Sequence, residues 1–141
     1  MSSEDDRRRF HESLERVSRD ATFYDRFYRH FIGSSDEIAA IFKGRDVLYI
    51  QQKLKTTLEM VANNADGDPG LDRYLEMLGR IHARLYISPN MFEHWRDALI
   101  KTAAESDPAF DEATERAWRR IIEPVVAKIS AAQGSGVSRP R

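Results

Sequence analysis

The chain contains no cysteine among its 141 residues. This absence excludes disulfide bonds, thiolate zinc sites, iron–sulfur clusters and a cysteine nucleophile. Long hydrophobic runs are also missing, and the first residues, MSSEDDRRR, contain no apolar signal core. We therefore expect a cytoplasmic protein that has no membrane partner.

The chain also lacks an excess of charge of either sign. It carries 22 basic and 23 acidic residues, which gives a formal net charge of -1. Nucleic-acid binding needs a field of positive charge, so no nucleic-acid partner is expected. Windows of alternating polarity and internal repeats are missing as well, which argues against strands and solenoids. The length suits one domain with a real core.

What the sequence does contain is apolar residues at helical spacing over most of its length. Two helices are expected to meet near Asp20, and a short helix follows the serine cap at Ser35 and ends near Phe42. A further helix begins at Asp46, and the next one carries the stripe of residues Leu71, Leu75, Leu78, Ile81 and Leu85. The class is therefore all-α.

Proline marks the last two predicted helices. Ser88-Pro89 starts one of them, Asp107-Pro108 starts the other, and Pro124 should kink the latter. About seven helices of unequal length favour an irregular packed fold over an up-and-down bundle. We assign residues 1–132 to one domain and residues 133–141, rich in Gly and Ser, to a flexible tail or truncated linker.

One histidine stands out because of its place on a helix. His82 lies at the edge of the apolar stripe that includes Leu78 and Ile81, so its ring should lie at the border of the buried face. An imidazole held this way can bind a metal through one nitrogen while the other donates to a backbone carbonyl. A half-buried structural histidine is the alternative interpretation.

Two aromatic residues add to this picture. Tyr28 lies beside the stripe Phe23, Phe27 and Phe31, and a phenol at the edge of an apolar face needs a hydrogen-bond partner when it is buried. A polar gas ligand is a candidate partner. Phe42 closes the short helix, where it could pack flat on a large planar ligand. Both could also be ordinary core aromatics.

These residues together resemble a bacterial globin. Residues 27–42 resemble the segment that brings a distal tyrosine, here Tyr28, and ends in a phenylalanine stacked on haem, here Phe42. Residues 78–82, followed by Ser88-Pro89 and Phe92, resemble the proximal helix and its successor. Residues 107–124 are similar to the last helix of sensor-type globins, which include globin-coupled sensors and their single-domain relatives. The resemblance covers residues 10–130.

The resemblance implies a globin fold, haem b as cofactor and His82 as the axial ligand of its iron. It also assigns Leu78, Ile87 and Phe92 to the haem pocket. Two registers fit the distal helix. In the first, which the overall spacing favours, Ile50 takes the gate position, Gln51 lies beside the pocket and Leu54 lies over the iron. In the second, Lys53 is the gate and Thr57 lies over the iron, with Leu54 still in the pocket.

The expected function is reversible binding of a diatomic gas, O2 or else NO or CO, by a gas-sensing module. The apolar residues of the last helix, Trp118, Ile121, Ile122 and Val125, suggest a homodimer through the last two helices, with an output domain or a signalling partner beyond the C-terminus. Two alternatives remain. One is an enzyme-like globin, an NO dioxygenase or a peroxidase, served by a separate reductase. The other is a haem-free interaction module.

Overall fold

The computed structural model describes residues 4–63, 69–83 and 89–136, and within these ranges it describes only the backbone of residues 63, 69, 82, 83, 89 and 132–136. The described residues form helices and no strands, which confirms the all-α class. The helices in chain order are α1 (Glu4–Ser18), α2 (Phe23–Gly33), α3 (Asp36–Phe42), α4 (Val47–Asn63), α5 (Pro69–Ala83), α6 (Pro89–Ser106) and α7 (Glu112–Gly136).

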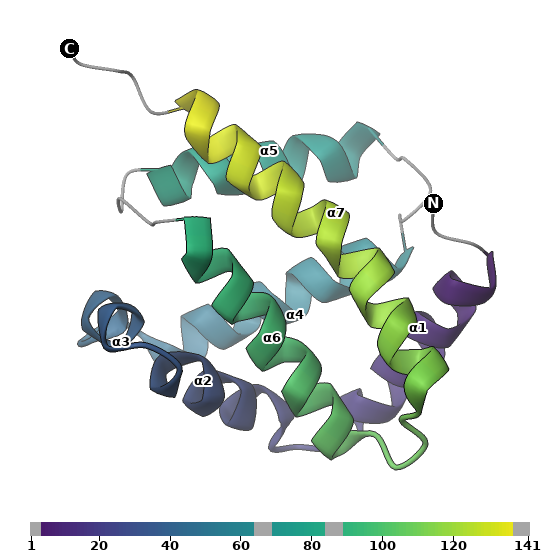
Figure 1. Cartoon of the computed structure of the whole chain (residues 1–141). Coiled ribbons are helices and arrows are strands. Elements are labelled where there is room, and N and C mark those ends of the chain that lie inside the picture. The colour runs from purple at the N-terminus through teal and green to yellow at the C-terminus, as the bar shows by residue number, and fades with distance from the viewer. Residues whose placement is uncertain (1–3, 64–68, 84–88, 137–141) are drawn as a thin grey trace.

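In Figure 1, α6 and α7 run alongside each other, whereas α4 and α5 run across them. The long α7 packs against α5, α1 and α6, and α6 also packs on α2. The helix α4 has different packing partners, namely α2 and α1. These crossings bury one continuous apolar core, whose largest fully buried side chains include Trp118, Phe10, Phe23, Ile38, Leu58, Leu99 and Ile122.

A buried carboxylate fixes the turn between α6 and α7. Asp107 is 3% exposed. It accepts hydrogen bonds from the Ser13 hydroxyl at 2.6 Å and, through both oxygens, from the Arg16 guanidinium at 2.6 and 3.0 Å. Burial raises the pKa of Asp107, but the hydrogen bonds from Arg16 and Ser13 outweigh it and hold the pKa below its usual value. Trp118 Nε1 donates to Ser13 at 2.9 Å, which extends the network into the core.

This network corrects one prediction. Asp107-Pro108 does not start the last helix, because α7 begins at Glu112. The carboxylate of Asp107 is already engaged by α1, and the N-cap role falls to Asp111, whose side chain accepts from the Thr114 backbone N–H at 2.8 Å. The helix then runs without a break through Pro124 to Gly136, into the stretch predicted as a tail.

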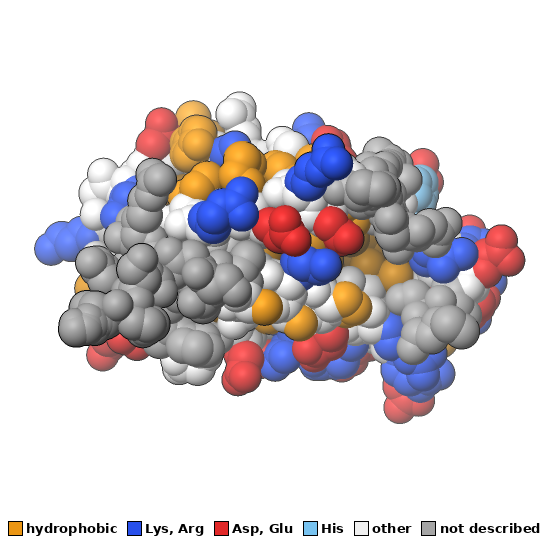
Figure 2. Space-filling view, turned by 90° about the horizontal axis from the view of Figure 1, so that it is seen from above, with side chains coloured by type: hydrophobic (Ala, Val, Ile, Leu, Met, Phe, Trp, Pro, Cys, Tyr) orange, Lys and Arg blue, Asp and Glu red, His pale blue; other side chains and the backbone are white. Residues whose placement is uncertain are grey.

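The surface over α5 and α7 is mixed in character. Figure 2 shows charged side chains of both signs there, with hydrophobic side chains between them. An ion pair between Lys128 and Asp72, 3.4 Å apart, joins the two helices. Met77 and Ile81 of α5 are 39% and 45% exposed. None of the described helices is both long and apolar enough to cross a lipid bilayer.

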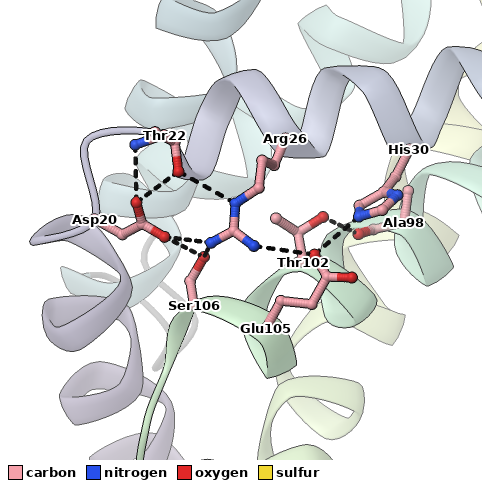
Figure 3. Close-up of polar contacts among 8 residues, drawn as sticks. All are labelled: Asp20, Thr22, Arg26, His30, Ala98, Thr102, Glu105 and Ser106. Atoms are coloured by element: carbon pink, nitrogen blue, oxygen red, sulfur yellow. Dashed lines mark hydrogen bonds and ion pairs between the residues drawn. The ribbon is translucent and has the colours of Figure 1, made fainter.

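A second polar cluster holds α2 against the end of α6 (Figure 3). Asp20 accepts from the Thr22 hydroxyl and N–H at 2.7 and 2.9 Å and from the Ser106 hydroxyl at 2.8 Å, and it pairs with Arg26. Arg26 also reaches Glu105 at 3.2 Å. Hydrogen bonds from Thr22 and Ser106 hold the pKa of the Asp20 carboxyl well below its usual range.

This lowered pKa predicts an acid-sensitive contribution to stability. A carboxyl whose pKa is lower in the folded than in the unfolded chain stabilises the fold above its unfolded pKa of about 4, and the contribution is lost as the pH falls toward the folded pKa. In Asp20→Asn, urea unfolding from pH 6 to pH 2.5 should therefore depend less on pH than in the wild type. Asp25→Asn, at an exposed carboxylate of α2, is the control, and an equal change in both variants would contradict the prediction.

Candidate functional site

Tyr28 and Phe42 come together where α2 meets α3. Tyr28 is 8% exposed, and its ring meets that of Phe42 edge-on, with the ring centres 6.4 Å apart. Phe31, one turn after Tyr28, also packs on Phe42, with ring centres 5.5 Å apart. The direction of α3 is set by Ser35, whose hydroxyl accepts from the backbone N–H groups of Glu37 and Ile38 at its first turn.

A tight loop then leads the chain from Phe42 into α4. Gly44 adopts a φ of +78°, a conformation that side-chain-bearing residues rarely take. Arg45 closes the loop by donating from Nε to the Ile41 carbonyl at 2.8 Å. Asp46 caps α4 by accepting from the Tyr49 N–H at 3.2 Å. The loop therefore holds the start of α4 beside Phe42.

A cavity of about 520 Å³ that is open to solvent lies at this junction. Of the predicted site residues whose side chains the structure describes, only Tyr28 and Phe42 line it. Its apolar wall is formed by the side chains of Tyr28, Ile32, Ala39, Ala40, Phe42 and Val47. Lys43, Arg45 and Asp36 also line it and bring charge to the site. The volume falls within the range of small-molecule and cofactor sites, which are typically about 300–1,000 Å³ and mostly apolar.

The Tyr28 hydroxyl has no hydrogen-bond partner among the residues that the structure describes. A buried phenol normally has one, because burying an unpaired hydroxyl costs about 1–3 kcal/mol. Since Tyr28 lines the cavity, the missing partner fits a polar ligand bound there. A pocket lined by apolar side chains, one phenol, two cationic side chains and one carboxylate fits one edge of a planar, largely apolar group with acidic substituents, such as haem.

The predicted residues of α4 differ in exposure. Leu54 and Thr57 are buried, at 5% and 6%. Ile50 and Gln51 are half-buried, and Lys53 is exposed. Thr57 donates from its hydroxyl to the Lys53 carbonyl at 2.9 Å, and its oxygen lies 3.0 Å from the phenol oxygen of Tyr74 on α5. The side chain of Thr57 therefore faces α5.

The proximal residues are described only in part. Leu78 is half-buried against the core, and Phe92 of α6 is 7% exposed and belongs to the core. His82 lies in the last turn of α5, but its side chain lies outside what the structure describes. Ile87 lies outside the described residues altogether. The predicted roles of His82 and Ile87 remain predictions.

Sequence reasoning missed Tyr74 and the loop residues around the cavity. Tyr74 lies one turn before Leu78 on the helix that carries His82, so its place on this helix could be predicted from the sequence. Its partner Thr57 could not be predicted, because a hydrogen bond between residues 17 positions apart leaves no periodic pattern in the sequence. Val47, Lys43 and Arg45 border a loop whose shape depends on the positive φ of Gly44.

Comparisons with known proteins place these observations in a family. The family model described as Globin matches residues 25–129. Among solved structures, the chain is similar to a protein from Pseudomonas aeruginosa that is described as structurally highly homologous to a human hemoglobin. The two share 32% identity with a TM-score of 0.85, over 91% of this chain and 98% of that one. No curated protein matches the chain.

Proposed function

Because this chain belongs to the globin family, we propose that it binds haem b and reversibly holds a diatomic gas there, as a gas-sensing module. Family membership implies haem binding. The observation that carries the proposal is Tyr28, a buried residue that lines the cavity and whose hydroxyl has no hydrogen-bond partner among the described residues. An absorption spectrum of the purified protein tests it. Absence of a Soret band after haem reconstitution would contradict it.

We assign the contacts to haem from residues on both sides. Phe42, which lines the cavity, would pack on the ring, and the half-buried Leu78 and buried Phe92 would add apolar contacts. The imidazole of His82 would be the axial ligand. Bound haem supplies an iron with one coordination position open to O2, NO or CO. The chain itself supplies the apolar surroundings and the hydrogen-bond donor.

The contacts of α4 bear on which of the two registers the distal helix takes. Thr57 faces α5, the helix that carries His82, whereas Leu54 and Leu58 are buried in the core. The Thr57 hydroxyl contacts Tyr74 directly, two turns before His82, so no haem could lie between this side chain and α5. These contacts favour the register with Ile50 at the gate and Leu54 over the iron. In this register the half-buried Gln51 lies beside the pocket, and Thr57 lies one turn further along α4.

Tyr28 would act as the donor that stabilises a polar ligand. A neutral hydroxyl that donates to a charge-bearing acceptor contributes about 1–3 kcal/mol. The pKa of the neighbouring Tyr24 is raised to about 12 by burial and by Glu59, so that side chain is protonated at neutral pH. For gas sensing, the Tyr28 hydroxyl would favour O2 over CO, because bound CO is the less polar ligand.

Tyr28→Phe is therefore expected to speed O2 dissociation by roughly five- to hundredfold and to change CO dissociation much less. Stopped-flow measurement of both rates checks this. Tyr24→Phe removes a hydroxyl from the same helix, one turn earlier, and should leave both rates close to wild type. Equal changes for the two gases in Tyr28→Phe would count against the assigned role.

The apolar residues of α7 do not support the predicted homodimer. Trp118, Ile121, Ile122 and Val125 are between 0% and 5% exposed within the single chain, so they are not available to a second copy. On the outer side of α6 and α7, Arg96 pairs with Asp97 and with Glu123, each at 3.0 Å. A homodimer through these helices, an output domain and a signalling partner all remain proposals.

A further inference from the structure

The hydrogen bond between Thr57 and Tyr74 joins α4 directly to α5. The two oxygens lie 3.0 Å apart. These helices otherwise have different packing partners, since α5 packs mainly on α7 and α4 on α2 and α1. We call this pair the α4–α5 clasp.

The direction of the hydrogen bond follows from counting the hydroxyl hydrogens of Thr57 and Tyr74. A threonine hydroxyl has one hydrogen and two lone pairs. The hydrogen of Thr57 is donated to the Lys53 carbonyl at 2.9 Å. Tyr74 must therefore donate its phenol hydrogen to Thr57. Both hydrogens of the clasp are engaged, so neither residue has a hydrogen left to donate to a ligand.

Burial raises the energetic cost of breaking this hydrogen bond. Thr57 is 6% exposed, and Tyr74 is half-buried against the apolar core. Removing one partner would leave the other hydroxyl poorly solvated, which costs more than the loss of an exposed hydrogen bond. Tyr74 lies two turns before His82 on the same helix, so the clasp fixes the proposed ligand helix relative to the proposed distal helix.

We propose that Tyr74 is a positioning residue that, through Thr57, holds α4 and α5 together and so slows haem release. This inference rests on the proposed function, because it assumes that haem binds between these two helices. Haem could leave only when the helices separate, and separation would break the clasp. Tyr74 itself would touch neither the iron nor the gas.

The experiment compares Tyr74→Phe, Thr57→Val and the double variant. Haem loss to an excess of a high-affinity acceptor should be roughly two- to tenfold faster in each single variant. The double variant should be no faster than the singles, because all three remove the same bond. Tyr49→Phe removes an exposed hydroxyl on α4 and should retain the wild-type rate.

A second readout works without haem. Amide hydrogen exchange in the haem-free protein should quicken in both α4 and α5 of Tyr74→Phe, whereas Tyr49→Phe should match wild type. Faster exchange with an unchanged rate of haem loss would overturn the proposal and leave a merely structural bond. Additive effects in the double variant would also overturn it. A wild-type protein that takes up no haem would refute the proposed function itself, before any variant is compared.

Discussion

His82→Ala should produce the largest functional loss of any single substitution in this chain. A haem-binding protein with one axial histidine loses its metal–protein bond when that imidazole is removed. The remaining contacts, such as those assigned to Phe42, Leu78 and Phe92, are apolar and do not fix the iron. We expect the purified variant to contain little haem, or haem whose absorption spectra in the ferric, ferrous and CO-bound states differ from wild type.

Two comparisons make this result specific to the ligand. Imidazole added in solution should restore a wild-type-like spectrum to His82→Ala, because the small ring can occupy the space left by the side chain. His94→Ala, at a half-buried histidine of α6, should leave haem content unchanged. If the His82 variant kept haem with the wild-type fifth ligand, the assignment of His82 would be wrong.

The largest loss of stability is expected from Asp107→Ala. The Asp107 side chain is fully buried and accepts from the Ser13 hydroxyl, the Arg16 guanidinium and the Ala109 N–H. Removing one member of a buried, hydrogen-bonded ion pair typically costs about 3–5 kcal/mol. Since Arg16 is partly exposed and can recover some hydration, we expect a loss of about 3 kcal/mol in the free energy of unfolding.

Urea unfolding at neutral pH measures this loss. Asp97→Ala is the matched control, because Asp97 is 59% exposed and surface substitutions usually change stability by less than about 0.5 kcal/mol. Asp107→Ala and Ser13→Ala should be non-additive, since the two side chains share one network. A loss no larger than that of Asp97→Ala would show that the buried network does not stabilise the fold.

Helix positions could be predicted well because burial imposes a period. The spacing of Phe23, Phe27 and Phe31 predicted α2, and all three are buried in the core. The cap at Ser35 was also visible, because capping uses residues two and three positions along the chain. Pro89 starts α6 as the sequence predicted. Such local rules predicted the starts of α3, α4 and α6 closely.

Long-range polar contacts could not be predicted. The sequence made Asp107 a helix cap, whereas its partner Ser13 lies 94 positions away. The apolar face of α7 was likewise read as an interface, but α1, α5 and α6 cover it. Periodicity shows which residues seek burial and does not show which neighbour buries them.

At the candidate site, too, local features could be predicted from the sequence and long-range contacts could not. Tyr28 and Phe42 could be grouped from sequence because Tyr28 lies beside an aromatic stripe, Phe42 closes the next helix and the resemblance pairs them. The structure places both at one cavity. The register of α4 could not be settled, since Ile50, Leu54 and Thr57 all lie at helical spacing. The hydrogen bond between Tyr74 and Thr57 shows that Thr57 faces α5, which spacing alone could not show.

The Asp107 network shares no residue with the cavity beside Tyr28. It anchors α1 to the turn between α6 and α7, whereas the cavity is formed by α2, α3, the loop after α3 and the first residue of α4. Substitutions at the exposed cavity residues Ala40 and Val47 should therefore leave the Asp107 network intact. The surface around the cavity can thus change in sequence without loss of the contact that anchors α1.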